Sequence, residues 1–170
     1  PLFIAVMGAV SFLGDGGVPV ILVAAIAAVC AARRKGLEAA FVAATLSAVL
    51  LADVLKVLVG RPRPPAFAIN LSAFFPSVNQ YAYPSGHVLF YVVFLGFLVY
   101  LSWKHLAGWL RWISISVGAA LIVLIGPSRI FLGKHWVSDV IGSYLIGTFW
   151  LIILILLYQI GLRRCPGSDE

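Results

Sequence analysis

Apolar runs long enough to cross a lipid bilayer dominate this sequence and limit what it can fold into. The longest runs cover residues 18–32, 37–59, 85–103, 113–126 and 135–162. A helix needs about 20 apolar residues to cross a hydrocarbon core of about 30 Å. The composition agrees, because 62% of the residues are hydrophobic, whereas soluble domains are about 45–50% apolar. We therefore predict an all-α protein, a polytopic transmembrane helical bundle with five clear spans.

A shorter apolar stretch, residues 2–13, ends in a turn at Gly14, Asp15, Gly16 and Gly17. A helix rises about 1.5 Å per residue, so this stretch reaches only about 18 Å, and we expect an interfacial helix or the truncated end of a spanning one. The chain begins at Pro1 without an initiator methionine, and no charged segment precedes an apolar one at its start, so we expect no signal peptide. Its length supports one bundle, so we predict a single domain over residues 1–170, which is compatible with a longer polypeptide.

The distribution of basic residues predicts the orientation in the membrane. The net charge is +6, but the twelve lysines and arginines lie in short clusters between apolar runs, a pattern that favours membrane topology or an anionic substrate over a nucleic-acid partner. Alternate loops collect Arg33, Arg34 and Lys35, then Lys104 and Arg111, then Arg163 and Arg164. By the positive-inside rule these loops are cytoplasmic. The other side carries Lys56, Arg61, Arg63, Arg129 and Lys134, and we predict that it faces the periplasm or the exterior of an inner or cell membrane.

One polar stretch, residues 128–139, lies between the last two apolar runs. Charged groups in such a position are functional candidates by default. His135 and Asp139 are four residues apart, so they share a face if the last helix has begun by His135. Asp139 would then accept the Nδ1 proton and leave Nε2 of His135 free to attack phosphorus. For this pair alone, a buried structural ion pair is the alternative.

Two further clusters supply groups that can hold and cleave a phosphate ester. Lys56, Arg63 and Arg129 can bind phosphate oxygens, although basic residues at helix ends also serve as interfacial anchors. Ser85 and Gly86 open a helix whose backbone N–H groups can meet an anion. His87 in the first turn can act as a general acid toward the leaving alkoxide.

The three clusters together resemble the signature of the type 2 phosphatidic acid phosphatase (PAP2) superfamily. Lys56 precedes Arg63-Pro64 by the family spacing, Pro-Ser-Gly-His occupies residues 84–87, and Ser128-Arg129 is followed by His135 and Asp139. No fixed position departs from the motifs. Membrane members of the family resemble six-helix bundles, whereas this chain shows five full spans.

The resemblance implies a role for each motif residue. His135 attacks phosphorus to give a phosphohistidine, Asp139 orients His135, and His87 protonates the leaving group. The phosphate oxygens are held by Lys56, Arg63, Ser85, Gly86 and Arg129, and water then releases inorganic phosphate. The family needs no metal or other cofactor, which agrees with the lack of a carboxylate cluster suited to Mg²⁺ in the sequence.

The expected function is therefore that of a membrane-embedded lipid phosphate phosphatase. Its substrate would be a lipid phosphomonoester or diphosphate of the phosphatidic acid, phosphatidylglycerophosphate or undecaprenyl diphosphate type. A lipid phosphotransferase using the same intermediate and a non-catalytic lipid-binding or lipid-transport module remain alternatives. Vanadate-dependent haloperoxidases share the motifs but are soluble, which the hydropathy opposes. The sequence does not specify the lipid or the oligomeric state.

Overall fold

The computed structural model describes residues 2–64 and 81–164, and these residues form an all-helical fold, as predicted. The helices are α1 (Leu2–Phe12), α2 (Val18–Ala32), α3 (Gly36–Ala44), α4 (Ser47–Val59), α5 (Gly86–His105), α6 (Gly108–Phe131) and α7 (Val137–Arg164). In these two ranges β-type pairing is limited to an isolated bridge between Pro62 and Tyr81.

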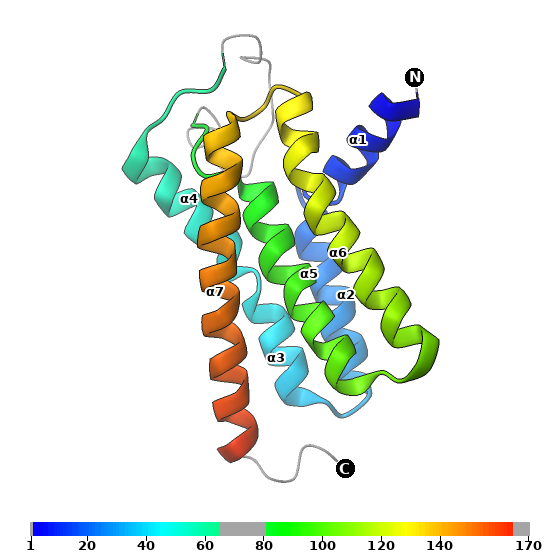
Figure 1. Ribbon diagram of the computed structural model, residues 1–170. Coiled ribbons are helices and arrows are strands. Elements are labelled where there is room, and N and C mark those ends of the chain that lie inside the picture. Colours follow the sequence, from blue (N-terminus) through cyan, green and yellow to red (C-terminus); the bar gives the residue numbers. More distant parts are fainter. Residues whose placement is uncertain (1, 65–80, 165–170) are drawn as a thin grey trace.

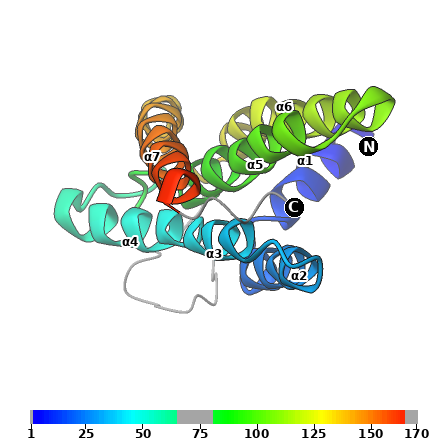
Figure 2. The ribbon, with the colours of Figure 1, turned by 90° about the horizontal axis from the view of Figure 1, so that it is seen from below.

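The helices pass up and down through one bundle (Figure 1). α2 leads away from the end of the bundle at which the chain begins, and α3 and α4 lead back toward that end. α5, α6 and α7 then alternate in direction (Figures 1 and 2). α5 contacts α3, α4, α6 and α7. It takes this central place because it is apolar on every side, and its residues 88–94 are all buried. The ends of α4, α6 and α7 that carry the sequence motifs lie at the same end of the bundle as the start of α5.

The number of full spans differs from the prediction of five. Among the described residues, four segments are long and apolar enough to cross a membrane, namely Gly36–Val59, which combines α3 and α4, and the helices α5, α6 and α7. α2 has only 15 residues and is therefore about 22 Å long. The run that we counted as the first span is thus a shorter apolar helix. α1 matches the predicted short N-terminal helix.

α6 continues through Pro127, although the sequence predicted that this span ends at Gly126. Proline removes one N–H group and frees the carbonyl of the residue four positions earlier. Here Tyr144 of α7 compensates: its hydroxyl lies 2.7 Å from the Ile122 carbonyl oxygen and 3.3 Å from that of Val123, and it accepts the N–H of Gly126 at 3.1 Å. The helix therefore reaches Phe131 and carries Arg129 in its last turn.

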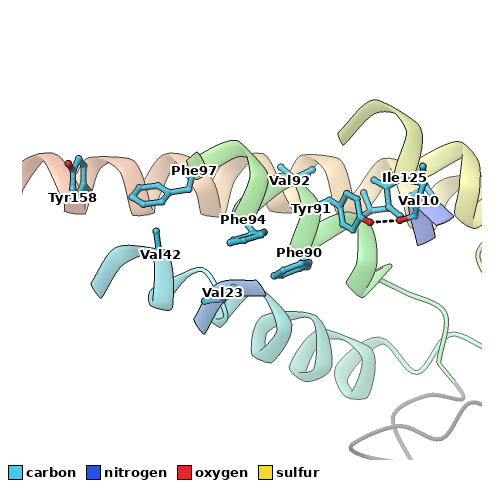
Figure 3. Close-up of a cluster of buried hydrophobic side chains, with 12 residues drawn as sticks. Val10, Val23, Val42, Phe90, Tyr91, Val92, Phe94, Phe97, Ile125 and Tyr158 are labelled. Carbon is cyan, nitrogen blue, oxygen red and sulfur yellow. Dashed lines mark hydrogen bonds between the residues drawn. The ribbon is translucent and has the colours of Figure 1, made fainter. Parts of the chain in front are cut away.

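The core between the helices is aromatic and aliphatic (Figure 3). Phe90 and Phe94 stack on the α5 surface with ring centroids 5.0 Å apart, and Phe97 meets Tyr158 of α7 edge-on at 5.6 Å. At the outer end of this core the buried Tyr91 hydroxyl donates to the carbonyl of Val10 (Figure 3). This bond attaches α1 to α5 close to the start of α5.

We predict that Tyr144→Phe destabilises the bundle by about 1 kcal/mol, because it removes the hydroxyl that replaces the helix bonds around Pro127. The midpoint of thermal unfolding in detergent should fall. Tyr100→Phe is the matched control, because the hydrogen bond of the Tyr100 hydroxyl within the described ranges is a long one, at 3.4 Å from Gln159. Equal midpoints for the two variants would contradict the role given to Tyr144.

Candidate active site

Contacts between distant segments bring the three motif clusters together at one end of the bundle. Ala82, just before α5, accepts a bond from His135, which precedes α7. Arg61, just after α4, bonds Asp139 in the first turn of α7. A Cβ atom on Gly86 would lie 3.5 Å from Nζ of Lys56. The site is thus a junction of four helix ends.

His135 lies in the turn between α6 and α7 and is only 4% exposed. Its Nδ1 lies 2.7 Å from the carbonyl oxygen of Ala82. A carbonyl oxygen only accepts, so Nδ1 carries the proton and Nε2 has a free lone pair. Burial, followed by the positive charges of Arg129 and Arg63, holds the pKa of His135 well below its usual 6.5. The imidazole is therefore neutral and nucleophilic at neutral pH.

Asp139 does not take the Nδ1 proton, in contrast to the prediction. Its Oδ2 lies 3.9 Å from Nδ1 of His135 and instead accepts the backbone N–H of Trp136 at 2.9 Å. The reason is that α7 begins at Val137, so His135 is outside the helix and the spacing of four residues does not align the two side chains. Asp139 occupies the third helical position and reaches back to the residue that caps the helix.

Arg61 is a site residue to which the sequence analysis gave no role. Its Nη1 donates to Oδ1 of Asp139 at 2.8 Å and to the Ser138 hydroxyl at 2.7 Å. Its guanidinium carbon also lies 5.8 Å from the centre of the Trp136 ring. Arg61 therefore neutralises the fully buried Asp139 and ties the segment after α4 to the start of α7. Its only sequence signal was a basic residue on the side that the positive-inside rule disfavours.

The three cations predicted to bind phosphate lie around this junction. Lys56 is 8% exposed and bonds Asp53 at 2.8 Å, and Arg129 is 1% exposed and donates to the Ser11 hydroxyl. Within the described part of the chain, the buried Nε atoms of Arg63 and Arg129 have no hydrogen-bond partner. Buried polar groups are nearly always bonded, so unpartnered guanidinium donors point to an anionic ligand.

Ser85 differs in part from its predicted role. Its backbone N–H, expected to face an anion, donates to the Ser143 hydroxyl at 2.7 Å, and that hydroxyl donates to the carbonyl of Asp139 at 2.6 Å. The buried Oγ of Ser85, however, has no partner among the residues that the structure describes. The hydroxyl is therefore the group of Ser85 that can bind a ligand.

His87, in the first turn of α5, bonds a residue that the sequence analysis had read only as part of a turn. Its Nε2 lies 2.8 Å from Oδ1 of Asp15, between α1 and α2. Burial raises the pKa of Asp15, but the hydrogen bond and charge of His87 together with the charges of Arg129 and Lys134 outweigh this effect, so the net pKa lies below its usual 3.8. Asp15 is therefore ionised beside the imidazole.

Comparison with known proteins identifies relatives of this chain. The model of the PAP2 superfamily matches residues 37–162. An undecaprenyl-diphosphatase of Sulfolobus acidocaldarius is 30% identical over 122 residues, which cover 72% of this chain and 55% of that protein. Phosphatidylglycerophosphatase B of Bacillus subtilis is 33% identical over 103 residues, which cover 58% of this chain and 46% of that protein. The chain thus spans about half the length of the curated relatives that it matches.

A solved structure is similar over most of the chain. It is the transmembrane PAP2 type phosphatidylglycerolphosphate phosphatase from Bacillus subtilis, with a TM-score of 0.78 and 25% sequence identity. The match covers 94% of this chain and 78% of that one.

Arg61→Gln is predicted to destabilise the site, because it leaves the carboxylate of Asp139 buried without its cation. We expect a loss of about 1–3 kcal/mol, measured as a lower midpoint of thermal unfolding in detergent. Arg164→Gln, at an exposed position in the last turn of α7, is the control and should unfold like the unaltered protein. If both variants unfold like the unaltered protein, Arg61 does not stabilise this junction.

Proposed function

Because the chain belongs to the PAP2 superfamily, we propose that it is a lipid phosphatase that hydrolyses a lipid phosphomonoester or diphosphate at the outer membrane face. The chain is an integral membrane protein, as its four long apolar helices and its transmembrane structural relative indicate. The observation that carries the proposal is His135, whose unprotonated Nε2 shares a buried site with the unpartnered groups of Ser85, Arg63 and Arg129.

In the first proposed step, Nε2 of His135 attacks phosphorus while the bond from phosphorus to the leaving oxygen breaks. Lys56, Arg63 and Arg129 neutralise the charge that spreads over the phosphoryl oxygens, and the Ser85 hydroxyl donates a hydrogen bond to one of them. His87 gives its proton to the leaving oxygen. The product is a phosphohistidine and a free lipid alcohol or lipid monophosphate.

In the second proposed step, water attacks the phosphohistidine and His87 takes the proton from that water. The phosphorus–nitrogen bond breaks, inorganic phosphate leaves, and His135 returns to its neutral form. The Ala82 carbonyl keeps the Nδ1 proton in place through both steps, so Nε2 is always the reacting nitrogen. Asp139 acts through the backbone of Trp136 by fixing the turn that carries His135.

The proposed substrate class follows from the names of the relatives and from the position of the site. The relatives are an undecaprenyl-diphosphatase and phosphatidylglycerophosphatases, all acting on a phosphate group attached to a lipid. The site lies at the end of the bundle opposite the basic turn Arg33–Lys35 and the basic end of α7. By the positive-inside rule this end faces the periplasm or cell exterior, where a substrate can keep its tail in the outer leaflet.

His135→Gln is predicted to lower phosphate release from a lipid phosphate in detergent by about a thousandfold or more, because it removes the nucleophile. Glutamine can still donate an N–H group to Ala82. His105→Gln is the matched control, because His105 lies at the opposite end of the bundle and should leave the rate close to that of the unaltered protein.

Phosphate release by His135→Gln at the original rate would contradict the assignment of His135 as the nucleophile. No phosphate release by the unaltered protein would favour a non-catalytic lipid-binding module. A lipid phosphotransferase shares the intermediate, and product analysis with and without an acceptor lipid distinguishes it from a hydrolase.

The lowered pKa of His135 predicts the pH dependence of the reaction. The nucleophile must be unprotonated, and its pKa lies well below 6.5, so it stays active as the pH falls through 6.5. We expect the acid limb of kcat/KM to lie below pH 6.5 after correction for titration of the substrate phosphate. If the corrected kcat/KM falls with an acid limb at or above pH 6.5, this assignment is wrong.

A further inference from the structure

The N-terminal segment, residues 2–17, contacts the site although it lies outside the part of the chain that the family model matches. Ser11 accepts a bond from the guanidinium of Arg129. The Ser128 hydroxyl donates to the carbonyl of Met7 at 2.7 Å. Asp15 bonds His87 at 2.8 Å. The segment therefore touches two of the three motif clusters through three separate hydrogen bonds.

Gly14 brings this segment directly against the imidazole of His87. A Cβ atom at position 14 would lie 2.5 Å from Cδ2 and 3.0 Å from Cγ of that ring. Such distances are well inside van der Waals contact, so any larger residue would displace the ring. Glycine here permits the close approach of backbone to side chain, and the next residue, Asp15, then reaches Nε2.

The charges around His87 show what Asp15 contributes. Burial of the ring opposes a positive charge on it most strongly, and Arg129 of α6 and Lys134 of the following turn oppose it further. His135 also lies close enough to interact with the ring. A general acid must nevertheless hold a proton before it gives that proton away. Asp15 is the carboxylate bonded to the ring, and it is ionised. It therefore counteracts part of the combined effect of burial and of the two cations on the imidazolium.

The bond also determines which nitrogen of His87 reacts. The Asp15 carboxylate accepts a hydrogen bond from Nε2–H, so Nε2 keeps its proton when the ring becomes neutral. The Nδ1 proton is then the one that can move. This arrangement has the same logic as a triad aspartate that fixes the tautomer of its histidine.

We propose that Asp15 is a positioning residue that holds the Nε2 proton of His87, so that Nδ1 exchanges the proton with the substrate. In the first step Nδ1 gives its proton to the leaving lipid oxygen. In the second step Nδ1 takes a proton from the attacking water, and the cycle closes with no other donor or acceptor. The α1–α2 turn is thus a fourth part of the active site. This inference rests on the proposed phosphatase function.

The test compares two leaving groups. Asp15→Asn keeps the shape of the side chain but removes its charge. We expect kcat/KM for a lipid phosphomonoester to fall by about 10- to 100-fold, a part of the 10²–10⁴ that a general acid contributes. For p-nitrophenyl phosphate, whose nitrophenolate leaves without a proton, the value should change little. The alkaline limb of the lipid profile should move to lower pH, because the imidazolium loses its carboxylate.

Two further variants keep the test decisive if Asp15→Asn folds poorly. Asp15→Glu restores the charge and should recover part of the lipid activity. Gly14→Ala displaces the ring and should lower lipid hydrolysis more than p-nitrophenyl phosphate hydrolysis. The midpoint of thermal unfolding in detergent checks folding for each variant.

The outcomes separate this inference from the proposed function. Unchanged lipid hydrolysis in Asp15→Asn, or an equal loss with both substrates, would overturn the role of Asp15 while leaving the phosphatase intact. An unaltered protein with no hydrolysis would instead overturn the proposed function, and full activity in His135→Gln would overturn its nucleophile.

Discussion

The need to pair charges buried in an apolar bundle organises the outer end of this protein. Arg129 and Asp139 are 1% and 0% exposed, and an uncompensated charge at such a depth is strongly unfavourable. Each is bonded to a residue from a distant part of the chain: Arg129 to Ser11, and Asp139 to Arg61. The bond that neutralises Asp139 and the bond that satisfies one donor of Arg129 therefore also hold the helix ends in the arrangement that the proposed chemistry requires.

Local sequence features predicted most of the fold and the position of the site. Apolar runs, interrupted by glycine, proline and basic residues, predicted the helices. They also predicted that the three motifs lie on the same side of the membrane. The errors in the helix bounds came from individual contacts that the apolar pattern does not reveal. Tyr144 compensates for Pro127 from another helix and lengthens α6. The capping contact of Asp139 with Trp136 is local, but the spacing of His135 and Asp139 suggested a different partner for the carboxylate, and α7 starts after His135.

The motif residues lie together at one end of the bundle, as expected, but their hydrogen-bond partners were predicted less well. The motif residues meet, yet the acceptor for His135 is the backbone carbonyl of Ala82, and a carbonyl group occurs at every position of a sequence. Asp15 is separated from His87 by 72 residues and lies in a glycine-rich turn, which is enough to explain an aspartate on its own. Only the fold reveals that the turn rests on the imidazole.

The lack of a side chain at Gly142 allows α7 to pack closely against the segment that precedes α5. The ring of Tyr83, which precedes the start of α5, lies so close to Gly142 that a Cβ atom there would be 2.5 Å from it. The neighbouring Ala82 bonds His135, and the neighbouring Ser85 bonds Ser143 of α7. The distance between α7 and the segment that leads into α5 is therefore coupled to the position of His135 in the proposed site, and lateral pressure from the bilayer that displaces α7 would change both at once.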